Sequence, residues 1–436
     1  MTDLTEVRAE VAAWLTQAWD PELSLAQWRA RLADSGWACP TWPREWGGRG
    51  LPAAAAAVVA QEFERSGAVP APEGVGMNLA GPTILEHGSD ELKRRFLRPT
   101  VTGQISWCQL FSEPGAGSDL AGLQARAQRD GGEFIVSGQK VWNTSAHHAD
   151  FGLLLARTDW DVPKHRGISY FVLPMRQAGV EVRPLRQMNG HASFNEVFLD
   201  RARIPAGNVI GDVDGGWTVA LATLAHERRL AAFSRPPALR PPALRPPALR
   251  RAPPGTGRAV REAAAESERA MAPYRWYPQR AGRPDLVIER AVAAGRHADP
   301  LVRQEIVKLI TLAWSARWTA QRAAAARALG RPPGPEGSVA KLASSNIARA
   351  AARVHALIAG PAGQLAGADD PSGEGGRAEG GRAGIISEIL LSVPAVSIAG
   401  GTDQIQRTIL GERILGLPRE PAADAGVPFR DVRRSG

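Results

Sequence analysis

A glycine-rich turn after a predicted strand is the first feature of this chain that could do chemistry. Residues 107–119 read WCQLFSEPGAGSD, a short apolar run followed by a turn that carries hydroxyl groups and a carboxylate. Gly115 and Gly117 lack a Cβ, so backbone N–H groups there could approach a pyrophosphate, and Ser112 and Ser118 could donate hydroxyl hydrogen bonds. The turn indicates a site for a phosphorylated cofactor, although glycine-rich turns are commonly only turns.

A second strand pattern changes the balance between these two interpretations. Residues 132–146 read GEFIVSGQKVWNTSA, which predicts a strand with Trp142 and Thr144 at its end. Together the two segments resemble the flavin-binding part of the acyl-CoA dehydrogenase family, in which a serine or threonine before the EPG turn contacts the isoalloxazine and a tryptophan covers its face. The resemblance implies FAD as the cofactor, with Ser112, Ser118, Trp142 and Thr144 in its site.

The resemblance extends over most of the chain. Four further segments match the family in its order: TWPREWGG (41–48), FNEVFLDRARIP (194–205), GGWTVALATLAHERR (215–229) and AGGTDQIQRTILGERILGLPRE (399–420). Several segments in one order are far more specific than any single motif. The family's fold is α+β, with an N-terminal helical domain, a central β-barrel domain and a C-terminal helical bundle.

The reaction of this family needs a carboxylate that removes the α-proton of an acyl-CoA while the flavin accepts the β-hydride. In many members this carboxylate directly precedes the GT of the GTxQIQR segment, where this chain has Gly400. A subset of the family places the base in an ER pair on the helix after the β domain, where this chain has Glu227 and Arg228. The resemblance therefore implies Glu227 as the base. The backbone N–H of Gly400 could still donate to the thioester carbonyl as an oxyanion contact.

The residues around this pair leave alternatives open. An isolated helix glutamate is more often an ordinary salt-bridged residue, and Glu227 is favoured as a base because position 400 has no carboxylate. Arg228 falls on the apolar face of Leu221 and Leu224, so it should either pair with a carboxylate or bind substrate. Structural pairing is the preferred interpretation for Arg228.

Three more residues match family positions around the dinucleotide. Thr402 and Gln404 correspond to positions near the AMP half of FAD. Gly360 corresponds to a glycine that lets the dinucleotide of a neighbouring subunit pass close to the backbone. The family usually continues with further glycine there, whereas this chain has Pro361 and Ala362, which departs from the inter-subunit pattern.

Composition argues against several other classes of protein. The formal charge is +9, but only five of the 53 basic residues are lysine, and no basic stretch with interleaved aromatics appears outside a proline-rich segment. The charge suits an anionic ligand such as a CoA ester better than a nucleic acid. Two cysteines, no signal peptide and no apolar run of about 18 residues predict a cytoplasmic protein without a membrane span. His147, His148 and His191 lack metal-ligand spacing, so we expect no metal.

The apolar pattern changes twice along the chain. Residues 1–105 show helical spacing, residues 106–213 show short β-rich runs between Gly, Asp and Pro turns, and residues 214–436 are helical again. Within the last part, residues 235–282 do not match the family, and residues 235–250 hold three copies of RPPAL. Paired prolines cannot continue a helix, so we expect a surface excursion there, with a docking segment as the less favoured alternative.

The resemblance implies FAD-dependent α,β-dehydrogenation of an acyl-CoA thioester to the trans-2-enoyl-CoA, with electron-transfer flavoprotein as the electron acceptor. It also implies a homodimer or homotetramer. Two alternatives remain: a subunit of a hetero-oligomer whose other subunit does part of the catalysis, and a flavin-binding nucleic-acid-associated protein on the same fold. The second alternative gives Glu227 no purpose.

Overall fold

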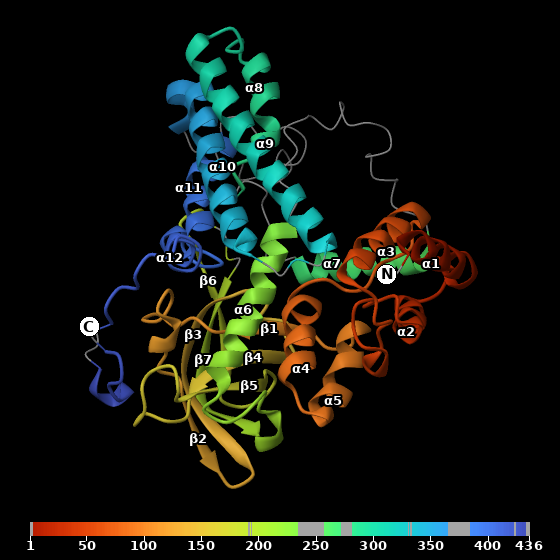
Figure 1. Cartoon of the computed structure of the whole chain (residues 1–436), viewed down its shortest axis with the longest axis vertical. Coiled ribbons are helices and arrows are strands. Elements are labelled where there is room, and N and C mark those ends of the chain that lie inside the picture. Colours follow the sequence, from red (N-terminus) through yellow and green to blue (C-terminus); the bar gives the residue numbers. More distant parts are fainter. Residues whose placement is uncertain are drawn as a thin grey trace, which may run out of the picture.

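The predicted α+β class is confirmed by the structure, a computed structural model of the chain (Figure 1). It describes residues 3–190, 192, 194–233, 257–271, 281–329, 331, 334–364, 384–422 and 424–432. Helices form the N-terminal and C-terminal parts, and a strand-rich part lies between them in the chain. None of the helices in the described ranges is long and apolar enough to cross a membrane.

Three of the N-terminal helices begin at the capping residues that helix starts favour. Ser24 and Gln27 form a reciprocal capping box at α2, and the side chains of Asp3 and Ser89 cap α1 and α5. Apolar residues at helical spacing bury one face of α1, α2 and α3 in the N-terminal core, whereas α4 and α5 pack in the cluster that they share with the sheet. The bounds are Leu4–Ala18 (α1), Leu25–Ser35 (α2), Ala53–Ser66 (α3), Gly81–His87 (α4) and Asp90–Val101 (α5).

The central part is a seven-stranded mixed sheet with the order β1-β4-β2-β3-β7-β6, in which β5 pairs with β4. Strand β1 runs parallel to β4, whereas β3 pairs antiparallel with both β2 and β7. The strands are Trp107–Leu110 (β1), Arg126–Asp130 (β2), Glu133–Asn143 (β3), Phe151–Arg157 (β4), Ile168–Pro174 (β5), Val180–Leu185 (β6) and Phe194–Pro205 (β7). Strands β4 and β5 are mostly apolar because both of their faces are buried.

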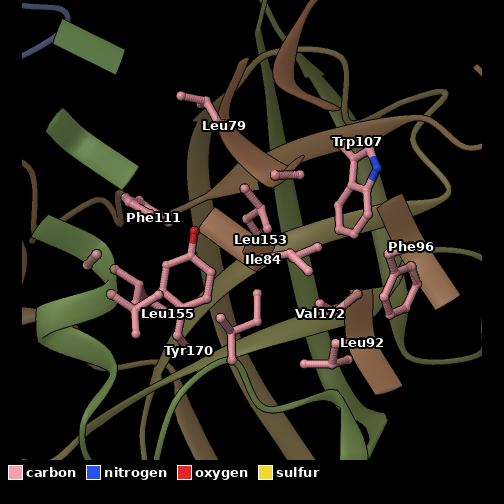
Figure 2. Packing of buried hydrophobic residues seen from close by; sticks show 14 of the residues in the cluster. Leu79, Ile84, Leu92, Phe96, Trp107, Phe111, Leu153, Leu155, Tyr170 and Val172 are labelled. Atoms are coloured by element: carbon pink, nitrogen blue, oxygen red, sulfur yellow. The ribbon is translucent and has the colours of Figure 1, made fainter. Parts of the chain in front are cut away.

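One hydrophobic cluster joins the N-terminal helices to the sheet (Figure 2). It combines residues of α4, α5, β1, β4 and β5, among them Ile84, Leu92, Phe96, Trp107, Phe111, Leu153, Leu155, Tyr170 and Val172. Full burial of one large apolar side chain contributes about 1.5–3 kcal/mol, so the cluster holds β1 firmly against the helices. The EPG turn, which follows β1, therefore starts from a rigid strand.

The C-terminal helices surround a core between α8, α9 and α10. In Figure 1 the long helices α9 and α10 lie side by side, away from the sheet, whereas α6 runs along the sheet. Helix α6 joins the shared cluster through Val219 and Ala220. The bounds are Gly216–Phe233 (α6), Arg258–Met271 (α7), Val287–Ala293 (α8), Pro300–Ala328 (α9), Glu336–Ala359 (α10), Gly384–Ser392 (α11) and Asp403–Arg413 (α12).

Helix α7 lies within residues 235–282, the stretch that does not match the family, and after the RPPAL repeat. It packs beside the N-terminal helices (Figure 1), where the Glu266 carboxylate accepts two hydrogen bonds from buried Arg29, at 2.8 and 3.0 Å. The Glu262 carboxylate also accepts from the backbone N–H of Leu25 at 2.7 Å. Part of the unmatched segment is thus anchored to the N-terminal part, while the RPPAL repeat at 235–250 lies outside the described residues.

Candidate active site

The two segments with the flavin-like pattern lie against each other at the end of β1 and β3. The backbone N–H of Val141 donates to the Ser112 carbonyl at 2.9 Å. The Lys140 ammonium donates to the Phe111 carbonyl at 3.0 Å and to the Glu113 carboxylate at 2.7 Å. The structure therefore places the EPG turn beside the strand that ends in Trp142.

Glu113 anchors the EPG turn from inside the protein. Its carboxylate also accepts the backbone N–H groups of Gln124 at 2.6 Å and Ala125 at 2.9 Å. Lys140 is fully buried, and this burial lowers the pKa of its ammonium group, an effect that the charge of Glu113 opposes. Sequence analysis missed this pair, although Lys140 shares the inward parity of Phe134 on β3.

Trp142 presents its ring to solvent from a constrained backbone. Its φ is +64°, a left-handed conformation that is uncommon for a large side chain, and its exposed fraction is 56%. Phe194 supports the ring edge-to-face at 5.7 Å between centroids. The next residue, Asn143, is buried and donates from Nδ2 to the Gln109 carbonyl at 2.8 Å. A fixed and exposed indole of this kind fits one face of a flat ring.

The EPG turn leaves room for a ligand. A Cβ built on Gly115 or Gly117 would meet no protein atom within 4 Å, so the packing of the protein does not itself demand glycine at either position. The side chains of Ser118 and Thr144 are exposed and that of Ser112 is half-buried. Free space, hydroxyl groups and an exposed indole together fit a flavin dinucleotide, as the sequence patterns imply.

Helix α6 holds Glu227 above the sheet through a buried hydroxyl network one turn earlier. The Thr223 hydroxyl lies 2.8 Å from the hydroxyl of Thr83 on α4 and 3.0 Å from that of Tyr170 on β5. Burial raises the pKa of Tyr170, and the negative charge of Glu227 adds to this shift, so Tyr170 stays a neutral phenol. The Glu227 carboxylate accepts from Gln109 Nε2 at 3.4 Å.

Gly400 lies directly beside Glu227. A Cβ built on Gly400 would lie 3.8 Å from Glu227 Oε1, which is an ordinary van der Waals contact. The two positions at which the family is expected to carry its base therefore converge from different parts of the chain, α6 and the turn before α12. Gly400 and Gly401 have φ of +68° and +84°, a region that favours glycine.

A buried glutamine supports this double-glycine turn. Gln406 Nε2 lies 3.2 Å from the Gly400 carbonyl oxygen and 3.4 Å from that of Gly401, so it can donate to both. A Cβ at Gly401 would approach Gln406 Nε2 to 2.5 Å, so a side chain there would displace the amide. Thr402 caps α12 by accepting from the Ile405 N–H at 3.1 Å, and the side chain of Gln404 is exposed.

A charged cluster fixes the start of α12 to α10. The buried Asp403 carboxylate lies 3.3 Å from both Lys341 Nζ and an Arg349 guanidinium nitrogen. Burial alone would raise the pKa of Asp403, but hydrogen bonds from Ser345 and Lys341 outweigh it and leave the pKa below the usual value. Sequence analysis did not find this cluster, because its members lie far apart in the chain.

The remaining predicted site residues have simpler surroundings. Gly360 ends α10 with φ of +58°, and a Cβ there would meet no protein atom within 4 Å. Arg228 lies on α6, but its side chain falls outside the described residues, as does His191. Across the described ranges, no cluster of His, Cys, Asp and Glu side chains could hold a metal ion.

Comparison with known proteins identifies the family. The models of the acyl-CoA dehydrogenase N-terminal, middle and C-terminal domains match residues 4–104, 108–202 and 286–415. The acyl-CoA dehydrogenase IpdE1 of Mycobacterium tuberculosis is 32% identical over 443 residues, which cover 96% of this chain and 99% of IpdE1. The acyl-CoA dehydrogenase FadE34 of the same organism is 36% identical over 420 residues. These residues cover 96% of this chain and 50% of FadE34, so the chain spans half of that relative.

A solved structure agrees with this result. The Tcur3481-Tcur3483 steroid ACAD has a TM-score of 0.64 and 25% identity, with 96% of this chain and 98% of that chain covered. Fold and site together define a flavoprotein oxidoreductase with two helical parts around a strand-rich part. The chain belongs to the acyl-CoA dehydrogenase family, and the comparisons support an enzyme of that class.

Proposed function

We propose that this chain catalyses the FAD-dependent α,β-dehydrogenation of an acyl-CoA thioester to the trans-2-enoyl-CoA. One observation carries the proposal: a Cβ at Gly400 would lie 3.8 Å from Glu227 Oε1. The Glu227 carboxylate on α6 therefore lies close to where a side chain at position 400 would begin. Glu227 would therefore act as the base that position 400 lacks.

Each site residue has a separate role in the proposed reaction. Glu227 removes the α-proton, while the N–H of Gly400 donates to the thioester carbonyl and stabilises the negative charge that develops on its oxygen. Bound FAD supplies the acceptor for the β-hydride. Trp142 would cover one face of the flavin ring, and the hydroxyl groups of Ser112, Ser118 and Thr144 would hydrogen-bond the cofactor.

The other assigned residues act further from the reacting carbons. Thr402 and Gln404 follow Gly400 in the chain and would contact the AMP half of FAD. Gly360 gives room for the dinucleotide of a neighbouring subunit. Arg228, next to the base, pairs with a carboxylate or binds substrate.

Electron-transfer flavoprotein accepts the electrons, and the assembly is a homodimer, a homotetramer or a hetero-oligomer. The hetero-oligomer has support from the paired designation of the related Tcur3481-Tcur3483 steroid ACAD. The same name includes the word steroid, so steroid-linked acyl-CoA esters belong in any substrate screen beside straight and branched chains.

An anaerobic screen tests this function. Purified protein is mixed with a panel of acyl-CoA esters, and bleaching of the flavin absorbance is followed. At least one ester should reduce the flavin in wild-type protein and not in Glu227→Gln. Protein that binds FAD but is reduced by no ester of the panel, alone or with its partner chain, contradicts the proposal.

A further inference from the structure

Gln109 on β1 joins the two halves of the proposed site. Its side-chain Nε2 donates to Glu227 Oε2 at 3.4 Å. Its backbone carbonyl accepts from Asn143 Nδ2 at 2.8 Å, and Asn143 directly follows Trp142 at the end of β3. One residue of a rigid strand therefore contacts both the carboxylate on α6 and the strand end that carries the exposed indole.

Strand β1 gives Gln109 a fixed position from which to act. It pairs in parallel with β4, where Gln109 lies opposite Leu153, a fully buried residue. Trp107 and Phe111 share its strand parity and lie in the cluster that joins the sheet to the N-terminal helices (Figure 2). Neighbours packed this tightly restrict movement of the backbone, so the amide is presented to Glu227 from a nearly constant origin.

We propose that Gln109 is a positioning residue for Glu227, which orients its carboxylate and sets the pH at which that carboxylate becomes ionised. The proposal rests on the proposed function for its catalytic meaning. An amide N–H that donates to a carboxylate favours the ionised form, because it stabilises charge that a partly buried site would otherwise disfavour. A base held ionised and oriented removes an α-proton without first losing its own.

Other groups around Glu227 set the background against which Gln109 acts. Tyr170 approaches from β5 and is a neutral phenol because burial raises its pKa. From α4, Glu86 lies 3.3 Å from His226 Nε2, beside Glu227 on α6. The turn before α12 presents Gly400, which carries no charge.

A titration of the carboxylate itself tests the proposal without any substrate. Holoenzyme is labelled with glutamate carrying ¹³C at the side-chain carboxyl, and the Glu227 resonance is identified by its loss in Glu227→Gln. In Gln109→Met the midpoint of this titration should rise by about one pH unit, as expected for loss of a donor to a charged group. In Gln109→Glu it should rise further, because a like charge adjoins Glu227.

The chain offers a matched control in Gln139→Met. Gln139 Nε2 donates to Glu196 Oε1 at 3.1 Å between β3 and β7, so this variant also removes a Gln–Glu hydrogen bond from the sheet. Its Glu227 midpoint should equal that of wild type. An unchanged midpoint in both Gln109 variants, or an equal shift in the control, overturns the proposal.

Kinetics separate this inference from the proposed function. With a good acyl-CoA, the acid limb of the pH profile for flavin reduction should move upward with the NMR midpoint in Gln109→Met, so that the rate below the limb falls roughly tenfold. An unmoved acid limb contradicts the positioning role while leaving the dehydrogenase function intact. If no ester reduces wild-type flavin, the proposed function fails, and the NMR midpoint still decides whether Gln109 sets the ionisation of Glu227.

Discussion

Substitution of Lys140 by methionine tests whether the buried ion pair with Glu113 anchors the EPG turn, the proposed flavin-binding segment. Methionine has similar length and no charge, so it leaves the Glu113 carboxylate buried without its cation. Breaking a buried pair in this way typically costs about 3–5 kcal/mol. Because Glu113 keeps the N–H donors of Gln124 and Ala125, we expect the lower end, about 3 kcal/mol.

The assay measures stability and cofactor binding in the same samples. Urea unfolding at saturating FAD gives the free energy of unfolding, and calorimetric titration of stripped protein gives the FAD dissociation constant. Lys140→Met should lower the first and weaken the second, since the turn loses its internal anchor. Lys308→Met serves as the control, because Lys308 pairs with Glu305 at an exposed position where an ion pair contributes about 1 kcal/mol or less.

A double variant separates loss of charge balance from loss of shape. In Lys140→Met with Glu113→Gln, the uncompensated charge is absent, so part of the lost stability should return. A loss below about 1 kcal/mol in Lys140→Met with unchanged FAD affinity would refute the anchoring role. An equal loss in the single and double variants would show that the amine packs the turn by shape alone.

Three other changes to the chain have expected outcomes. Burial lowers the pKa of His355 on α10 to about 4. The unfolded chain therefore takes up a proton first, and the free energy of unfolding should fall as pH drops from about 6.5 to 4, a loss of up to about 3 kcal/mol that His355→Gln removes in pH-dependent urea titrations. Gln406→Leu should loosen the turn at Gly400 and raise the KM for acyl-CoA more than it alters FAD content; unchanged kinetics would contradict this. Deletion of residues 235–250 should leave FAD stoichiometry and Tm nearly unchanged, because the contacts of α7 with Arg29 lie outside the repeat; a large loss of either would show that the repeat packs on the fold.

The α–β–α order could be predicted because its signals are local. Strand alternation and helical spacing depend on neighbours within a few residues, and strands such as β4 and β5 are mostly apolar because both of their faces are buried. The RPPAL repeat predicts a break in the C-terminal helices for an equally local reason, the fixed φ of proline, but the repeat lies outside the described residues. Docking of α7 could not be predicted, because Arg29 and Glu266 are 237 residues apart.

For the candidate site, sequence motifs pointed to single residues but not to the contacts between them. Motifs pointed to Glu227 and to the lack of a carboxylate at Gly400. The distance of 3.8 Å between Glu227 Oε1 and a Cβ built on Gly400 depends on how α6 and the turn before α12 pack. Gln109 carries no motif signal, since a glutamine in a short strand is ordinary. Lys140 left a weak signal, a charge at an inward strand position, which requires a buried partner.

The central claim is that Glu227 is the base. Stopped-flow measurement of flavin reduction by a good acyl-CoA, in wild type and Glu227→Gln at equal FAD content, tests it most directly. Glu196→Gln is the control, because it removes a carboxylate that accepts a glutamine hydrogen bond elsewhere in the sheet. The rate of flavin reduction should fall by at least about 10²-fold in Glu227→Gln and should equal the wild-type rate in the control. Reduction at the wild-type rate in Glu227→Gln would contradict it and place the base elsewhere.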